Sequence, residues 1–177
     1  MPHNLSLAPD AEVNATLALL REGELSGDIV SNQQLLPGLF FSLDPESETT
    51  GRFRSEPGRL LDMEFNAATP GRWMALHLAL GPADLSGRQV LGVVCRCSSP
   101  QTTTFRFCLR SGRDGGFTDS FLRKTVVATT GSGTHLDALV LDGDPVVPAV
   151  APWRELILFF RPETSQILLQ DLRVFIV

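Results

Sequence analysis

Apolar and polar residues alternate along most of the chain after residue 38, with the period of two that a β-strand with one buried face requires. Earlier in the chain, Val13, Leu17 and Leu20 recur at helical spacing, and Gly23 follows at a position where a helix would end. The pattern therefore predicts a helix within residues 9–22, an irregular connection with a short strand near 28–30, and then a succession of strands. These strands are expected over residues 39–43, 52–54, 59–65, 73–80, 89–98, 103–110, 120–129, 134–141, 155–161 and 167–177.

Turn-forming residues separate the expected strands. They include Pro70-Gly71, Ser86-Gly87, Asp114-Gly115-Gly116, Gly131-Ser132-Gly133, Asp142-Gly143-Asp144-Pro145 and Pro162-Glu163. Many short strands with almost no helix are typical of a sandwich and not of a parallel α/β sheet. We therefore predict an all-β fold, a two-sheet antiparallel β-sandwich (jelly roll) with a short N-terminal helix. Residues 1–38 are expected to form a helical and irregular extension packed on the sandwich, and residues 39–177 the jelly-roll domain.

Composition limits the classes of function. The 177 residues, 43% of them hydrophobic, are enough for one substantial core, and the length favours one domain. A formal charge of -5 leaves no basic excess to displace counterions from a phosphate backbone, which argues against nucleic-acid binding. No apolar run reaches the roughly 20 residues that cross a bilayer, so no membrane partner is expected. The first residues lack the basic start and apolar centre of a secretory signal, which predicts a cytoplasmic chain, with export by another route left open.

Alternation also sorts the side chains of three expected strands into two rows each. The apolar rows, expected in the core, are Met74, Leu76, Leu78 and Leu80; Leu91, Val93, Cys95 and Cys97; and Phe105, Phe107 and Leu109. The chain has three cysteines, an odd number, which are expected as buried thiols and not as disulfides or metal ligands. The opposite rows bring together the candidate ligand-binding residues Trp73, His77, Arg96, Arg106 and Arg110.

This second set has the chemistry of a saccharide site. A tryptophan stacks on the apolar face of a sugar ring, and arginine and histidine donate hydrogen bonds to hydroxyl groups. Three arginines favour a carboxylate, sulfate or phosphate substituent, and hence an acidic saccharide. The alternative stays open that these residues cover the solvated face of an antiparallel sheet without binding any ligand.

Several segments together resemble a known superfamily. They are Asp84-Leu85-Ser86-Gly87 before the run 91–95, the strand 103–109, the loop 110–117, and the last strand with Gln170-Asp171-Leu172. Over residues 39–177 the chain resembles the jelly-roll carbohydrate-binding modules of the galactose-binding-domain-like superfamily. The resemblance implies a non-catalytic glycan-binding module, although the superfamily also contains modules that bind proteins or lipids.

The resemblance also implies a structural calcium ion. Many members hold one near the first and last strands, with a carboxylate of the last strand as a ligand, which here corresponds to Asp171, and Asp44 would be a second oxygen donor. Alternatively, Asp171 pairs with Arg173 or another cation. The family's aromatic sugar platform is less evident, since the chain has 2 Trp, no Tyr and 11 Phe, most of which are expected in core rows. Trp153 would line a loop-end site or pack at the entrance of a strand.

No catalytic constellation is recognisable. Jelly-roll polysaccharide lyases that resemble this architecture commonly use a tyrosine, which the chain lacks, and no Gly-x-Ser-x-Gly elbow occurs. We therefore expect a glycan-binding module, with a protein-interaction or assembly module and an enzyme with an unrecognised site as alternatives. The exposure of Trp73 distinguishes the first two, because a buried indole cannot anchor a sugar.

Overall fold

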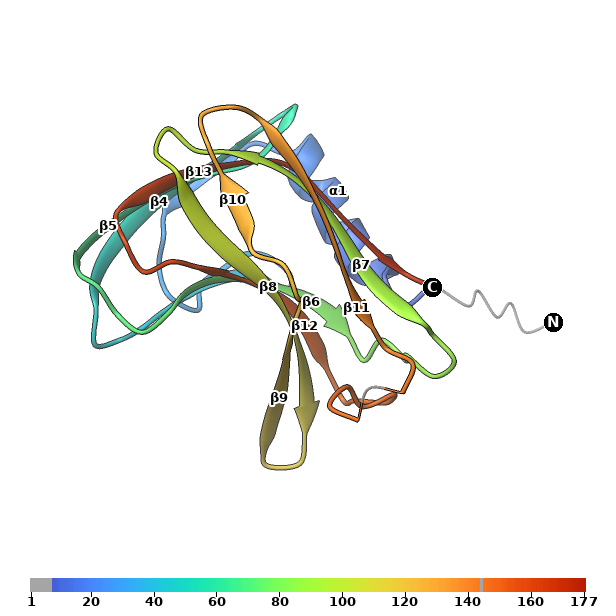
Figure 1. The fold of residues 1–177 in the computed structure, drawn as a ribbon. Helices are drawn as coiled ribbons and strands as arrows, with labels where there is room; N and C mark the ends of the chain where they lie inside the picture. Colours follow the sequence, from blue (N-terminus) through green and yellow to red (C-terminus); the bar gives the residue numbers. More distant parts are fainter. Residues whose placement is uncertain (1–7, 144) are drawn as a thin grey trace.

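The computed structural model describes residues 8–143 and 145–177, which form two antiparallel sheets packed face to face (Figure 1). The sheet that we call sheet A has the strand order β1 (Leu25–Asp28), β4 (Glu48–Glu56), β5 (Arg59–Thr69), β13 (Ser165–Ile176), β7 (Val90–Ser98), β11 (Gly133–Val140). Sheet B has the order β10 (Val126–Ala128), β8 (Thr103–Arg113), β12 (Arg154–Phe160), β6 (Met74–Gly81), β3 (Leu39–Leu43), β2 (Gln34–Leu36), and β9 (Gly116–Phe121) also pairs with β8. The predicted all-β sandwich with one short helix is confirmed.

The predicted core rows face the space between the sheets. All residues of the three apolar rows are buried in one cluster, which joins strands of both sheets. The three cysteines are buried and free, as expected. Since burying a side chain the size of leucine or phenylalanine contributes about 1.5–3 kcal/mol, these rows hold the two sheets together.

Helix α1 (Ala11–Glu22) belongs to the same core. Val13, Leu17 and Leu20 are buried in the central cluster, and the helix contacts β6 of sheet B as well as β4, β5 and β13 of sheet A. Gly23 ends the helix, where its N–H donates to the Leu19 carbonyl at 2.9 Å. No helix in the described ranges is long and apolar enough to cross a membrane.

The predicted extension over residues 1–38 is integrated into the sandwich. Strand β1 pairs with β4 at the edge of sheet A, and β2 pairs with β3 at the edge of sheet B. The short strand predicted near 28–30 instead spans Leu25–Asp28. Residues 1–7 of the predicted extension lie outside the described residues. The boundary at residue 38 is therefore a change in hydrophobic pattern and does not separate two units.

One predicted strand, over residues 120–129, is wrong. Strand β8 continues to Arg113 and turns through Asp114 and Gly115 into β9, and this hairpin projects from the rest of sheet B (Figure 1). Gly115 has a φ of 73°, a conformation that glycine adopts without steric cost. Residues 126–128 then form the separate strand β10, which pairs with the beginning of β8. The hairpin is important because β9 adds side chains to the outer face of sheet B.

A buried arginine fixes the loops near the start of β12. Arg154 is 1% exposed, although its side chain is charged. Its guanidinium donates to the carbonyl of Ala83 at 3.0 Å, to the carbonyls of Pro148 and Ala149, and to the hydroxyl of Ser111. One side chain thus joins the loop after β6, the loop before β12 and strand β8.

Candidate functional site

The structure brings four of the five predicted ligand-binding residues to one surface. Trp73 lies just before β6 and His77 within it, and both are on the outer face of sheet B. Arg106 and Arg110 lie on the same face, on β8. The prediction that Arg96 joins them is wrong, because β7 lies in sheet A, between β13 and β11. Alternation shows on which side of its own sheet a residue lies. It does not show to which sheet the strand belongs.

A cleft of about 570 Å³ crosses this outer face, which we call the aromatic cleft. Its lining comes from β3, β6, β8, β9, β12 and the residues just before β6. The residues are Ser42, Arg72, Trp73, His77, Arg110, Phe117, Asp119, Phe121, Phe159 and Phe160. The cleft therefore combines aromatic rings with hydrogen-bonding side chains from strands that are far apart in the sequence.

The aromatic rings remain accessible in the cleft. Phe117 and Phe121 are 45% and 39% exposed, and the ring centroids of Phe121 and Phe159 lie 5.5 Å apart. Trp73 is half-buried, and its Nε1 donates to Ser42 Oγ at 3.2 Å, which holds the indole in place. Trp73 is thus not buried, so its indole is accessible to a sugar ring, as a sugar anchor requires.

The rings stand on a rigid base. Ala75, Cys108 and Ile157 are fully buried on this outer side of sheet B, and Phe159 packs against them. Strands β6, β12 and β8 are neighbours in that order, so these three side chains form one layer across the centre of the sheet. A platform built on strands and supported by packed side chains loses little conformational freedom when a ligand binds.

The arginines of the cleft are engaged with neighbouring side chains. Arg110 donates from Nε and Nη2 to the two carboxylate oxygens of Asp119, both at 2.7 Å, and its guanidinium carbon lies 3.7 Å from the centroid of the Phe117 ring. The guanidinium carbon of Arg106 lies 4.5 Å from the centroid of Phe121. Both cations therefore pack on aromatic rings of β9 and orient them.

A second polar pair lies in the floor of the cleft. His77 is 5% exposed, its Nδ1 lies 2.8 Å from Glu155 Oε2, and its ring stacks on Phe40 with centroids 4.6 Å apart. Glu155 is also opposite Arg110 across the β12 and β8 pair. Most charges around the cleft are thus matched by an opposite charge or a polar partner. Among the described residues of this face, Arg106 has no carboxylate partner.

Sequence reasoning missed the phenylalanines of this face. Five of the 11 Phe are buried, namely Phe41, Phe65, Phe105, Phe107 and Phe160, and Phe53 packs against the same core, so the expectation that most lie in core rows is confirmed. In β12 both rows are apolar, and alternation alone does not separate Phe159 from the core residue Phe160. Phe117 and Phe121 were missed because β9 was not predicted. Their spacing of two with Asp119 is the signal that could have found them.

The two predicted calcium ligands do not fit a shared ion. Asp44 follows β3 in sheet B, whereas Asp171 lies in β13 of sheet A. Asp171 accepts from Arg21 at 2.8 Å and from Arg173 at 3.0 Å, which is the cation pairing weighed as the alternative. Within residues 8–143 and 145–177, no group of three or more His, Cys, Asp or Glu has an arrangement that could hold a metal ion. Arginine side chains hydrogen-bond to both acids, Arg72 to Asp44 and Arg21 and Arg173 to Asp171.

Asp44 instead fixes the rim of the aromatic cleft. It is buried, and its Oδ2 accepts from the backbone N–H of Arg72 at 2.7 Å and from Arg72 Nε at 3.0 Å, while Oδ1 accepts from the Glu46 N–H at 3.1 Å. These hydrogen bonds, those from Arg72 above all, lower the pKa of Asp44 to about 2. The guanidinium carbon of Arg72 lies 5.2 Å from the centroid of Trp73, so Asp44 positions the neighbour of the predicted sugar anchor.

The ionised Asp44 carboxylate should therefore stabilise the folded protein, and this stabilisation should be lost in acid. Its folded-state pKa of about 2 lies below the ordinary value of 3.8, so its stabilisation is present above pH 3.8 and is lost as the pH falls from 3.8 towards 2. We expect Asp44→Asn to lower the urea midpoint at neutral pH, and the difference from wild type to shrink over that acid range. Asp28→Asn is the control, because the Asp28 side chain is 80% exposed and 3.6 Å from Arg52. A difference between Asp44→Asn and wild type that is the same at pH 7 and pH 2 would contradict this role.

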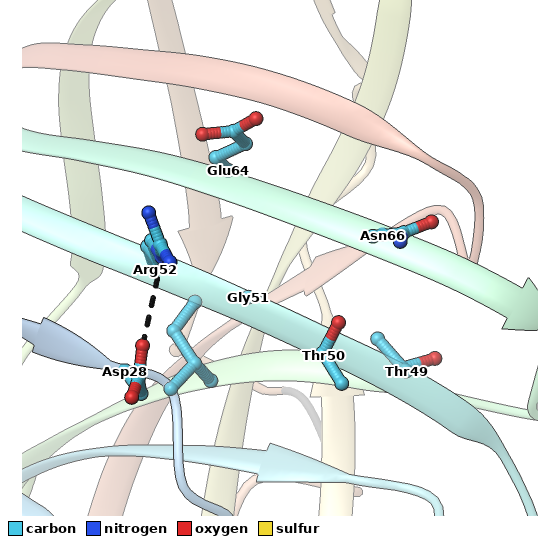
Figure 2. Close-up of a pocket in the computed structure, with 8 residues that line it drawn as sticks. Asp28, Thr49, Thr50, Gly51, Arg52, Glu64 and Asn66 are labelled. Atoms are coloured by element: carbon cyan, nitrogen blue, oxygen red, sulfur yellow. Dashed lines mark ion pairs between the residues drawn. The ribbon is translucent and has the colours of Figure 1, made fainter.

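The outer face of sheet A carries a different kind of hollow (Figure 2). It has a volume of about 480 Å³ and is lined by Asp28, Ile29, Thr49, Thr50, Gly51, Arg52, Glu64 and Asn66. Figure 2 shows Arg52 and Thr50 on β4, Glu64 and Asn66 on the neighbouring β5, and the ion pair between Arg52 and Asp28. Its lining, as far as the structure describes the chain, contains no aromatic ring. The aromatic cleft is therefore the better candidate for a saccharide site.

Comparison with known proteins identifies the fold but no family. No protein-family model matches the sequence, and no curated protein matches it. Among solved structures, a carbohydrate-binding module reported under "CBM4 structure and function" is 15% identical to this chain. The two superpose with a TM-score of 0.57 over 85% of this chain and 95% of that chain. A family 11 carbohydrate-binding module from a cellulosomal cellulase of Clostridium thermocellum is 11% identical, with a TM-score of 0.54 over 86% and 94%. These similarities confirm that the chain has the jelly-roll fold found in carbohydrate-binding modules.

Proposed function

We propose that this protein is a non-catalytic module that binds a neutral saccharide in the aromatic cleft. The observation that carries the proposal is the set of accessible rings of Trp73, Phe117, Phe121 and Phe159 on one rigid sheet face. The apolar C–H faces of a sugar pack on such rings, and the polar side chains between the rings match its hydroxyl groups.

The charges of the cleft favour a neutral saccharide over the acidic one that the three arginines suggested. Arg96 lies on the other sheet, and Arg110 is bound to both carboxylate oxygens of Asp119 through the edge formed by Nε and Nη2. An anionic substituent near Arg110 would lie close to the Asp119 carboxylate, which already neutralises this arginine and would repel a second negative charge. Neutral hydroxyl groups of a sugar can instead donate hydrogen bonds to Asp119 or accept them from Arg110, and they bring no additional charge into the cleft.

The similar structures support a saccharide ligand. A family 11 module from Clostridium thermocellum, 8% identical with a TM-score of 0.54 over 87% of this chain and 97% of that chain, is described in complex with a β-1,3-1,4-mixed-linked tetrasaccharide. A non-catalytic role agrees with the pairing in the cleft. Asp119 is bound to Arg110 and Glu155 contacts His77, so both carboxylates have partners within the protein.

Calorimetric titration of the chain with a saccharide panel tests the proposal. The panel contains neutral β-linked glucose, xylose and mannose oligosaccharides, together with uronate and sulfated oligosaccharides of equal length. We expect at least one neutral oligosaccharide to bind and to change the fluorescence of the chain, because Trp73 lines the cleft. Silence of every neutral member, or binding in this cleft of acidic members only, would contradict the proposal.

A further inference from the structure

Sheet A carries a cationic hollow on its outer face, across the two layers of the sandwich from the aromatic cleft. It has a volume of about 510 Å³ and crosses the neighbouring strands β5, β13, β7 and β11. We call it the arginine hollow. Its lining residues are Gly58, Arg59, Val94, Arg96, Thr134, Leu168, Gln170 and Asp171.

A β-bulge shapes the centre of this hollow. In the pairing of β13 with β7, Leu169 is opposite Cys97 and Asp171 is opposite Arg96, so Gln170 is an extra residue. Gln170 and Asp171 are consequently both half-exposed, instead of alternating between core and surface. Bulges redirect side chains in this way and are frequent beside functional sites.

Two arginines flank the bulge from the neighbouring strands. Arg96 is exposed on β7, and its Nε donates to Ser132 Oγ at 2.8 Å, while Ser132 also contacts the side-chain oxygen of Gln170. On the other side, the pairing of β5 with β13 ends at Leu61 and Leu169, and Arg59 lies two residues beyond that pair. Neither Arg59 nor Arg96 has a carboxylate partner in the described part of the chain.

Among the described residues that line the hollow, Asp171 is the only carboxylate, and it is already neutralised. Asp171 forms ion pairs with Arg21 at 2.8 Å and with Arg173 at 3.0 Å. Arg59 and Arg96 line the hollow, Arg21 and Arg173 adjoin it through Asp171, and these four guanidinium groups and one carboxylate sum to a formal charge of +3. Glu56, which is opposite Arg59 across β4 and β5, is itself paired with Arg54. The whole chain carries -5, so the hollow is a concentrated patch of opposite sign. The nearest acid along β5, Asp62, accepts a hydrogen bond from Gln166 at 3.1 Å.

We propose that the arginine hollow binds a sulfate or carboxylate group of an acidic saccharide. A guanidinium group presents paired N–H donors that match the oxygens of such groups, and Arg96 is held by Ser132 with both terminal nitrogens free of partners among the described residues. The Thr134 hydroxyl and the Gln170 amide supply further donors at the same level of the sheet. This site is distinct from the aromatic cleft and does not depend on it, because the two lie on opposite sheets.

Titration by NMR and calorimetry tests this site with three probes in about 50 mM salt, where exposed charges are little screened. The probes are inorganic sulfate, a sulfated oligosaccharide and a neutral oligosaccharide of the same length. We expect the sulfated oligosaccharide to bind more tightly than sulfate and to shift the amide signals of Arg96, Thr134 and Gln170. Equal affinity for inorganic sulfate would show that the ligand is a free anion, and the saccharide assignment would be overturned.

Matched variants separate specific binding from general electrostatic attraction. Arg96→Gln and Arg59→Gln should each weaken binding of the sulfated oligosaccharide about fivefold or more, since each removes a charge-assisted donor. Arg52→Gln removes the same charge from an exposed arginine of this sheet face that is paired with Asp28, and should change affinity less than twofold. Equal losses in all three variants would overturn the proposal. Binding of a neutral oligosaccharide by Arg96→Gln should match wild type, which keeps this test independent of the aromatic cleft.

Discussion

Replacement of Arg154 with alanine is expected to lower the free energy of unfolding by about 3–5 kcal/mol. The substitution removes a side chain that is 1% exposed and leaves a cavity beneath two loops. It also deprives three backbone carbonyls, those of Ala83, Pro148 and Ala149, and the hydroxyl of Ser111 of their donor. Buried acceptors without partners lose the hydrogen bonds that water supplies in the unfolded chain. Urea unfolding measures the change, as a lower midpoint at an unchanged slope.

Two further variants show whether the guanidinium network is the cause. Arg154→Lys keeps the charge and much of the volume but offers one nitrogen in place of three, so it should recover only part of the loss. Arg161→Ala removes an arginine whose side chain is 68% exposed and should cost less than about 0.5 kcal/mol. A stability of Arg154→Ala within about 1 kcal/mol of wild type would mean that water replaces the network and that the loops hold without it.

Replacement of Trp73 with alanine is expected to weaken binding of a neutral oligosaccharide by about 2 kcal/mol, or about 30-fold in Kd. Trp73 lines the aromatic cleft, and its indole is held by the hydrogen bond to Ser42, so the ring is already in place when a sugar arrives. Large preorganised rings at the centre of a site contribute most of the binding energy. Calorimetry with the tightest neutral oligosaccharide of the panel measures the loss.

Trp153 provides a control of the same residue type. It is 38% exposed just before β12, and its indole lies over Gly112, where an added Cβ would overlap Nε1. It does not line the aromatic cleft, so Trp153→Ala should change the affinity less than threefold. An equal loss in both variants would point to binding outside the cleft. Because Trp73 is half-buried against Ser42, the urea midpoint of Trp73→Ala must also remain close to wild type for its loss to be assigned to contact with the sugar.

Much of the fold follows from local patterns. The spacing of Val13, Leu17 and Leu20 predicts α1, and the structure buries all three. Alternation in residues 73–80 and 103–110 assigns the correct side chains to the core, because a strand necessarily sends successive residues to opposite sides. The predictions failed where the same residue pattern is compatible with two different structures. Both rows of β12 are apolar, and β9 is a short strand of mixed composition behind a glycine turn.

The candidate sites depend on pairing between strands that are distant in the sequence. Strands β6, β12 and β8 become neighbours in sheet B although long segments separate them, and β9 pairs with β8, which brings Trp73, Phe159 and Phe121 to one cleft. The same kind of pairing places Arg96 beside Asp171 in sheet A, far from the residues with which it was first grouped. Two-residue periodicity contains no information about which strand is the neighbour, because every strand has the same period.

The residue pattern was sufficient for the class of fold, the helix, the main core rows and the outward direction of the arginines, because these follow from backbone geometry and from burial of apolar side chains within each segment. The division of strands between the two sheets, the ion pairs that occupy Asp44 and Asp171, and the separation of an aromatic from a cationic face were decided by tertiary structure. These features require long-range backbone pairing and packing of the whole core, which no single segment specifies.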